Sequence, residues 1–314
     1  MELETRRRGQ EPAAGRRRRA RRAPIERLRS RLSELELSLP RAGRDLTARL
    51  RSLPPKPPAG LRLVTFNIAH GRRRRPHQTL VGRERVRRNL SQVARVLEAL
   101  KPDVVALQEA DGPSAWSGNF DHVATLAAES RLNAHYRGDH NPFGFGRYAL
   151  ASGTALLARW PLIEPRSHRF GSSWRCTKGF VVATVEVPSW DGLAIDVASV
   201  HLDFLAPQKR RQQIDAMAEV LEPRRRSRPL VVLGDLNCCY EREPESISVL
   251  TRRLGLRAYR PERPQPTYPA YLPRRRLDWI LVSDELVFHH HQRLPVKLSD
   301  HLGVVADLQL RASA

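Results

Sequence analysis

Acidic, amide and imidazole side chains recur in this sequence directly after runs of apolar residues. Asn67 follows the run that begins at Leu61, Glu109 follows the run from Val104, and His201 follows the run from Leu193. Further groups of the same kind lie in Gly234-Asp235-Leu236-Asn237, Leu277-Asp278 and Ser299-Asp300-His301. Carboxylates are costly to bury unless they are paired or bound to a cation. Their oxygens suit Mg²⁺ or Mn²⁺ better than Zn²⁺, so together these residues indicate a metal-assisted reaction at a phosphate group.

The apolar runs that would position these groups have the length and pattern of β-strands. We predict strands over 61–67, 104–108, 155–158, 180–187, 193–200, 230–233, 279–282 and 303–308. Three- and four-residue apolar spacing predicts helices over 86–100, 120–132, 208–221 and 245–254. Some strands alternate with helices and others follow one another directly, which predicts a layered α/β fold with a partly antiparallel pair of sheets.

The first sixty residues differ in composition from the rest of the chain. They contain 17 Lys and Arg against 7 Asp and Glu, and they end in a proline-rich run at 53–58. We therefore expect residues 1–59 to form a basic, Pro-rich, largely disordered tail and residues 60–314 to form one catalytic domain. Apolar residues from Pro24 to Leu39 predict a short amphipathic helix in the tail, which would dock on the domain or contact a membrane or partner.

The formal net charge of +22 points to an anionic partner: nucleic acid, a membrane surface or a phosphate-bearing substrate. A compositional bias is the alternative, because nearly all the basic residues are arginine.

The three cysteines make neither a disulfide framework nor a Cys/His zinc spacing. No apolar run reaches the roughly 20 residues needed to cross a bilayer. We expect a cytoplasmic protein, free or peripheral to a membrane or nucleic acid; nothing in the sequence indicates its oligomeric state.

The histidine run His289 to His291 is a second place where a metal could be suspected. It falls in a predicted loop, and the surrounding sequence supplies no further ligands. Transition-metal sites need several converging ligands, so we do not expect a metal there.

In their order along the chain, the polar motifs resemble those of the endonuclease/exonuclease/phosphatase superfamily of metal-dependent phosphodiester hydrolases. The motifs are Thr65-Phe66-Asn67, Leu107-Gln108-Glu109, Ser199-Val200-His201-Leu202, Gly234-Asp235-Leu236-Asn237, Arg276-Leu277-Asp278-Trp279-Ile280 and Ser299-Asp300-His301. The resemblance covers about Leu61 to Leu308. It implies a four-layer α/β/β/α sandwich of two mixed sheets with outer helices, and Mg²⁺ or Mn²⁺ as the cofactor.

The resemblance also implies roles for the residues around the metal and the attacking water. Glu109, with Asn67 beside it, would hold the metal that polarises the phosphate, and Asp300 would supply a second metal ligand. Asp235 and Asn237 would orient the water and the phosphate, and Asp235 is also a candidate base. These roles match what attack on a phosphodiester requires: an activated water and neutralised phosphate oxygens.

Two histidines complete the implied site. Asp278 would accept a hydrogen bond from His301, which would contact the phosphate or act as base. His201 would donate to a phosphoryl oxygen or protonate the leaving group. Lys178-Gly179 stands where many members carry an Arg-Gly pair before a strand. Lys178 would contact substrate phosphate, although a solvated turn lysine is an equal interpretation. Tyr268 resembles an aromatic residue at the active-site rim, and core packing would account for it equally well.

The motifs do not identify the substrate, because members of the superfamily share a reaction but act on different substrates. Ala110-Asp111 after Glu109 and Cys238-Cys239 after Asn237 differ from the abasic-site repair enzymes. Arginine runs at 72–75, 224–226 and 274–276 favour nucleic acid, bound through phosphate contacts that carry no sequence information. The alternatives are a phospholipid, as for the sphingomyelinases, or another phosphoester at an anionic membrane. A catalytically dead polyanion-binding protein would have lost a principal motif residue, and none is missing.

Overall fold

The computed structural model describes residues 50, 53–140, 144, 150–171, 178–240 and 244–312. All of them belong to the unit Thr47–Ala314. Most of the predicted tail, including its amphipathic helix, lies outside the described residues. The end of the tail that is described contacts the domain: Lys56 Nζ donates to Asp103 Oδ2 at 2.8 Å, and Trp190 Nε1 donates to the carbonyl of Ala59 at 2.7 Å.

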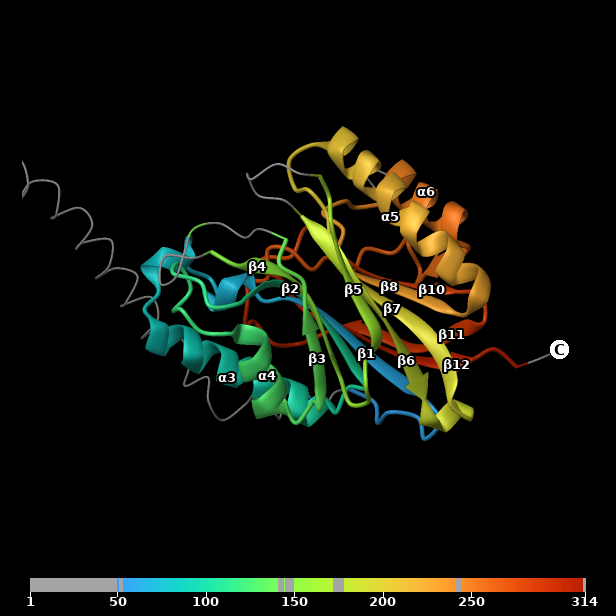
Figure 1. The fold of residues 1–314 in the computed structure, drawn as a ribbon, viewed down its shortest axis with the longest axis horizontal. Helices are drawn as coiled ribbons and strands as arrows, with labels where there is room; N and C mark the ends of the chain where they lie inside the picture. Colours follow the sequence, from blue (N-terminus) through green and yellow to red (C-terminus); the bar gives the residue numbers. More distant parts are fainter. Residues whose placement is uncertain are drawn as a thin grey trace, which may run out of the picture. The chain divides into compact units, whose positions relative to one another are not determined.

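Two mixed sheets of six strands each form the centre of the described fold (Figure 1). The first has the order β11 (Leu286–Arg293), β12 (Val304–Leu310), β1 (Leu61–Asn67), β2 (Val104–Asp111), β4 (Ser152–Ala158) and β3 (Ala134–Arg137). The second has the order β5 (Ile163–Arg169), β6 (Gly179–Val187), β7 (Leu193–His201), β8 (Leu230–Asp235), β10 (Asp278–Ser283) and β9 (Leu256–Ala258). Each sheet contains one parallel pair, β1 with β2 and β7 with β8.

Helices cover the outer faces of the two sheets (Figure 1). The pair α3 (Arg83–Leu100) and α4 (His122–Ser130) lies over the first sheet, and the pair α5 (Pro207–Ser227) and α6 (Pro244–Leu254) lies over the second. One cluster of buried apolar side chains joins both sheets, and another joins the second sheet to α5 and α6. The predicted four-layer α/β/β/α sandwich is therefore confirmed. The described connections contain the short 3-10 helices η1 (Ala69–Gly71), η2 (Gln78–Leu80) and η4 (Pro188–Trp190).

The apolar spacing of the sequence accounts for the elements around the site. Every residue of β1 is buried, as expected for a strand with both faces covered. Helix α3 buries Val86, Leu90 and Val93 on one side, and Lys101 in a left-handed conformation ends it. The loop predicted for the histidine run 289–291 was wrong, because these residues form part of β11, paired with β12. Their polar side chains concealed the strand pattern.

An internal ion pair joins two neighbouring strands of the first sheet, β1 and β12. Arg62 on β1 stands opposite Asp307 on β12 in the strand register. Its Nε and Nη2 donate to the two carboxylate oxygens of Asp307 at 2.7 and 2.8 Å, and both side chains are buried. Such bidentate pairing supplies the compensation that a buried carboxylate requires.

Candidate active site

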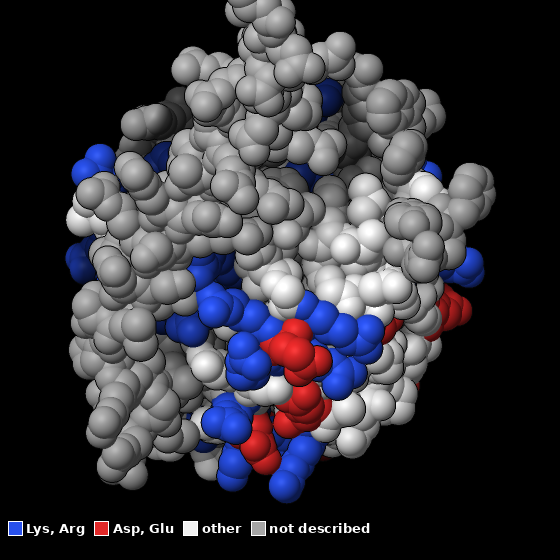
Figure 2. All heavy atoms as spheres, turned by 90° about the vertical axis from the view of Figure 1, so that its left-hand side faces the viewer, with Lys and Arg blue, Asp and Glu red and all other residues white. Residues whose placement is uncertain are grey.

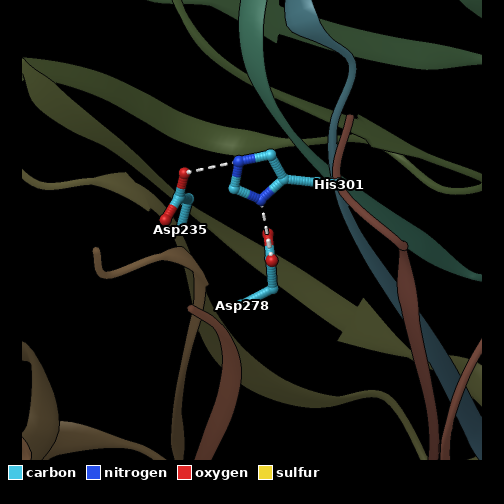
Figure 3. A group of neighbouring side chains, drawn as sticks. All are labelled: Asp235, Asp278 and His301. Atoms are coloured by element: carbon cyan, nitrogen blue, oxygen red, sulfur yellow. Dashed lines mark hydrogen bonds and ion pairs between the residues drawn. The ribbon is translucent and has the colours of Figure 1, made fainter. Parts of the chain in front are cut away.

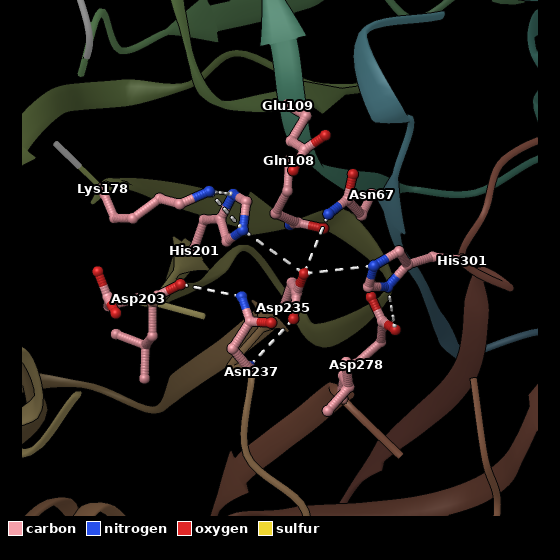
Figure 4. Close-up of polar contacts among 12 residues, drawn as sticks. Asn67, Gln108, Glu109, Lys178, His201, Asp203, Asp235, Asn237, Asp278 and His301 are labelled. Atoms are coloured by element: carbon pink, nitrogen blue, oxygen red, sulfur yellow. Dashed lines mark hydrogen bonds and ion pairs between the residues drawn. The ribbon is translucent and has the colours of Figure 1, made fainter. Parts of the chain in front are cut away.

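The candidate active site lies where the ends of strands from both sheets meet (Figure 4). Asn67 at the end of β1 is in register with Gln108 of β2. His201 at the end of β7 is in register with Asp235 at the end of β8. Asp278 begins β10, which runs antiparallel to β8, so it stands opposite Asp235. The strand register thus gathers residues that are far apart in the sequence.

Asp235 is at the centre of the hydrogen-bond network (Figure 4). Its Oδ2 accepts a hydrogen bond from Asn67 Nδ2 at 3.0 Å and lies 3.5 Å from His201 Nε2 and 3.7 Å from His301 Nε2. Its Oδ1 accepts from the backbone N–H of Asn237 at 3.0 Å. Burial raises the pKa of Asp235; His301 opposes the rise, and the Asp278 carboxylate adds to it. A carboxylate whose pKa is raised is a stronger proton acceptor at neutral pH.

Hydrogen bonds hold both the backbone and the side chain of Asn237. Besides the backbone contact to Asp235, its side-chain Nδ2 donates to the carbonyl of Leu202 at 3.0 Å. The backbone φ of 49° puts Asn237 in the left-handed region, which Asn tolerates better than most residues. The loop after β8 is thereby tied to the loop after β7.

Asp278 and His301 form the buried pair that the family resemblance implies (Figure 3). His301 Nδ1 donates to Asp278 Oδ2 at 2.9 Å. Burial alone would lower the pKa of His301, but the carboxylates of Asp278 and Asp235 outweigh it and raise that pKa to about 10. The imidazole is therefore a cation at neutral pH. A cation suits contact with phosphate oxygens and cannot accept a proton, so of the two roles implied for His301 the geometry favours phosphate contact.

His201 stands on the other side of Asp235, next to Lys178. Lys178 Nζ donates to His201 Nε2 at 2.9 Å. Burial, and then the neighbouring Lys178 ammonium, lower the pKa of His201 well below its ordinary value. A neutral imidazole can hydrogen-bond a phosphoryl oxygen but has no extra proton to give. The geometry therefore favours the phosphate-binding role for His201 over protonation of the leaving group, and it joins Lys178 to the same site.

Glu109 is directed into the site by an irregularity in β2. The pairing of β2 with β4 shifts between Leu107 and Ala110, and Glu109 has a φ of 50°. Bulges of this kind change the direction in which a side chain points. Glu109 Oε2 lies 3.2 Å from His70 Nε2. Burial would raise the pKa of Glu109, but His70 and then Lys178 outweigh it and hold that pKa well below its usual range. Glu109 is therefore ionised at neutral pH.

His70 and its partners are functional candidates to which the sequence reasoning assigned no role. His70 Nδ1 lies 2.8 Å from Asp111 Oδ1, and Trp116 Nε1 donates to Asp111 Oδ2 at 3.0 Å. The chain Trp116–Asp111–His70 thus ends on the carboxylate of Glu109. Carboxylate–histidine pairs behind a metal ligand fix its orientation. The available signal was a histidine three residues after Asn67 and an aspartate two residues after Glu109.

The donors present fit a divalent cation. Glu109 offers an ionised carboxylate at the end of β2, beside the amide of Asn67 at the end of β1. Asp235, Asp278 and His301 also lie together, with ligand atoms within 4.8 Å of one another (Figure 3), but the charged imidazole of His301 has no lone pair to offer a metal. Asp278 Oδ1 is buried and has no hydrogen-bond partner among the described residues. Carboxylate and amide oxygens are the ligands that Mg²⁺ and Mn²⁺ prefer.

The two remaining predicted site residues lie near His301. The Tyr268 ring is 4.8 Å from the His301 ring, centre to centre. Asp300 is held by Arg72, whose Nη2 lies 2.5 Å from its Oδ2. Within the described part of the chain, no contact joins Asp300 to Glu109 or Asn67, so its role as a metal ligand stays a prediction. The structure brings the other predicted residues together.

Comparison with known proteins agrees with this geometry. Residues 64–301 match the Endonuclease/Exonuclease/phosphatase family. YbhP from Escherichia coli (strain K12) is 29% identical over 231 residues, which are 70% of this chain and 88% of YbhP. Among solved structures, an endonuclease/exonuclease/phosphatase from Beutenbergia cavernae matches with a TM-score of 0.62 and 21% identity, over 80% of this chain and 72% of that one. The human Nocturnin catalytic domain with bound sulfate anion matches with a TM-score of 0.60 and 18% identity, over 82% and 97% of the respective chains. The family match covers most of the chain and all the motif residues, so this protein belongs to the endonuclease/exonuclease/phosphatase family of hydrolases.

Proposed function

We propose that the protein hydrolyses phosphodiester bonds with a divalent cation, Mg²⁺ or Mn²⁺, as its cofactor. The observation that carries this proposal is the placement of a carboxyl group and an imidazole whose pKa values both lie above their ordinary ranges. Asp235 Oδ2 and His301 Nε2 are 3.7 Å apart. A proton acceptor beside a fixed cation is what attack by water on a phosphate needs.

Different residues of the site would act on the attacking water and on the phosphate oxygens. Asp235 would accept a proton from the attacking water at one of its carboxylate oxygens, while the Asn67 amide and the Asn237 N–H hold that carboxylate in place. The His301 imidazolium, fixed by Asp278, would face the non-bridging phosphate oxygens. Preorganised charge of this kind is usually the largest contribution to catalysis.

The opposite side of Asp235 would bind the other phosphate oxygens. His201 and Lys178 lie there, and the Lys178 ammonium can donate to an oxygen that gains negative charge as the ester bond breaks. A divalent cation held by Glu109 and Asn67 would polarise the phosphate and neutralise its charge. Because every principal motif residue is present and most of them meet in one site, catalysis explains the arrangement better than polyanion binding on an inactive scaffold.

A hydrolysis assay on two soluble esters tests this proposal. Full-length protein would be incubated with bis(p-nitrophenyl) phosphate or p-nitrophenyl phosphate across Mg²⁺ and Mn²⁺ titrations, with a chelator as the metal-free control. The expected result is metal-dependent release of nitrophenol from the diester. Failure of the diester to react with either metal, or preference for the monoester, would contradict diester hydrolysis.

A pair of matched variants connects the activity to the site. Asp235→Asn removes the proposed proton acceptor, and we expect its diester turnover to fall by about 10² or more, the size typical of general base catalysis. Asp215→Asn is the control, because Asp215 lies on α5, is half-exposed and pairs with Arg253. Equal turnover in the two variants would contradict the role of Asp235.

A further inference from the structure

The loops that surround the candidate active site carry unusually exposed apolar side chains. Among the described residues, five large hydrophobic side chains are 50–74% exposed: Leu80, Phe204, Leu205, Tyr271 and Leu272. Exposed apolar groups that cluster, instead of being scattered singly, mark interaction sites.

All five side chains lie at the end of the fold that holds the site. Phe204 and Leu205 follow β7 by way of His201. Tyr271 and Leu272 follow Ala270, whose N–H donates to the carbonyl of Asp300 at 2.7 Å. Leu80 ends η2, between the end of β1 and the beginning of α3. The three connections emerge beside the ends of β1, β7 and β12 from which the site is built.

The two other exposed hydrophobic side chains provide an internal comparison. Ile163 and Leu310 are only 38% and 37% exposed. Ile163 begins β5, six residues before Arg169, which pairs with Gly179 beside the site. Leu310 ends β12, whose first residue, Val304, pairs near the site end of β1. Both therefore lie at the far end of the sheets, so among the described residues the strongest apolar exposure is found in the loops around the site.

Basic side chains accompany the apolar ones in these loops. Arg74 lies over the Tyr271 ring at 5.5 Å, and Lys178 lies over the Phe204 ring at 5.8 Å. Arg275 lies over the Tyr268 ring at 5.0 Å, on the same loop as Tyr271. Aromatic rings with cations beside them, together with leucines, suit the headgroup region of an anionic bilayer.

A nucleic acid fits this surface less well. Single strands are bound by aromatic rings that stack on bases along an unbroken positive groove. Leu205, the most exposed of the apolar side chains, has no ring with which to stack. In the part of the molecular face in Figure 2 that described residues form, Lys and Arg side chains lie among Asp and Glu side chains.

We propose that Leu80, Phe204-Leu205 and Tyr271-Leu272 dock the protein on the surface of an anionic phospholipid bilayer. The loop side chains enter the headgroup region, and the site between them opens toward the lipid phosphates. On this basis the substrate is a phosphodiester of a lipid headgroup. This assignment of the substrate rests on the proposed function, whereas the docking on the bilayer does not rest on it.

Vesicle co-sedimentation with the full-length protein tests the docking. The vesicles would contain phosphatidylcholine alone or mixed with phosphatidylglycerol. The test variant combines Leu205→Ser with Leu272→Ser, and the control combines Ile163→Ser with Leu310→Ser. We expect wild type and control to prefer the phosphatidylglycerol vesicles, and the test variant to bind them at least about tenfold more weakly. Repeating the comparison in about 1 M salt, where the Debye length is about 3 Å, removes most of the contribution of the basic residues 1–59.

The outcomes separate docking from catalysis. Equal vesicle binding by the test and control variants would overturn the proposal. So would weak vesicle binding by all three proteins combined with a loss of oligonucleotide binding in the test variant alone, which would identify a nucleic-acid surface. Hydrolysis of bis(p-nitrophenyl) phosphate is measured in parallel. An inactive wild type whose vesicle binding still depends on the two leucines would refute the proposed reaction and leave the docking supported.

Discussion

Replacing Asp278 with asparagine tests whether the Asp278 carboxylate keeps His301 charged, because the substitution removes one negative charge and changes the shape of the side chain little. Asp278 Oδ2 accepts the hydrogen bond from His301 Nδ1 at 2.9 Å, and both side chains are buried. The asparagine can still accept a hydrogen bond through its amide oxygen, but it no longer balances the charge of the imidazolium. The predicted consequence is a large fall in the pKa of His301.

The size of the effect follows from the environment of His301. A pKa of about 10 in place of the ordinary 6.5 corresponds to roughly 5 kcal/mol in favour of the charged imidazole, at about 1.4 kcal/mol for each tenfold change. Burial opposes the charge, and Asp278 makes the largest favourable contribution. Without Asp278, burial prevails, and the pKa of His301 should fall to its ordinary value or below it.

Two measurements report this change. In wild type, activity should persist until the pH approaches 10, whereas in Asp278→Asn the alkaline decline should begin near neutral pH. The rate at pH 8 should fall by about 10²–10³, as when one preorganised donor is lost. The unfolding free energy gives a readout that does not depend on turnover. A raised histidine pKa stabilises the folded state fully below about pH 6.5, and this stabilisation is lost as the pH rises through about 10.

The wild-type protein should therefore lose more stability than Asp278→Asn between pH 6.5 and pH 10. Comparing the two proteins cancels the titration of surface groups that they share. An alkaline limb that does not move, together with equal pH dependence of unfolding in both proteins, would show that Asp278 does not raise the pKa of His301.

Three further substitutions probe the metal ligand, its support and the core. Glu109→Gln should raise the Mg²⁺ concentration needed for half-maximal activity by about tenfold or more, and an unchanged metal titration would speak against ligation. His70→Ala should weaken Mg²⁺ binding, measured by calorimetry, by about 10–100-fold, as loss of an orienting partner does. The control His77→Ala, at an exposed position, should bind Mg²⁺ as wild type does. Equal losses of affinity in the two variants would show a general effect of the loop. Arg62→Met leaves the Asp307 carboxylate buried without its bidentate partner and should lower the unfolding free energy by about 3–5 kcal/mol in denaturant titrations. A loss below about 1 kcal/mol would contradict that account of the core.

The order of motifs in the sequence was enough to predict the fold and most of the site. Helix α3 was predicted over 86–100 and runs from Arg83 to Leu100, because its apolar face repeats every three or four residues. Strand β5 was missed because most of its side chains are exposed and it lacks an apolar run. Strand β11 was missed because histidines occupy its centre. The sequence predicted best those strands that are buried on both faces.

The protonation of the site could not be read from the sequence, since it depends on neighbours brought together by folding. His201 and His301 have similar sequence surroundings, each within two residues of a carboxylate. In the structure His201 meets Lys178 and is neutral, whereas His301 meets Asp278 and is charged. The contact between His70 and Glu109 likewise depends on the bulge in β2, which no sequence motif marks. The predicted tail, residues 1–59, stays a prediction for the part outside the described residues.

One experiment tests whether water attacks a phosphodiester at phosphorus with the help of Asp235 and a divalent cation. A soluble diester would be hydrolysed by the full-length protein in ¹⁸O-labelled water with Mg²⁺, and the product examined by ³¹P NMR. We expect one ¹⁸O atom in the released phosphomonoester, much less product with Asp235→Asn, and no product above background with a chelator. Product without ¹⁸O on phosphorus, or labelled product formed equally well by Asp235→Asn, would contradict this mechanism.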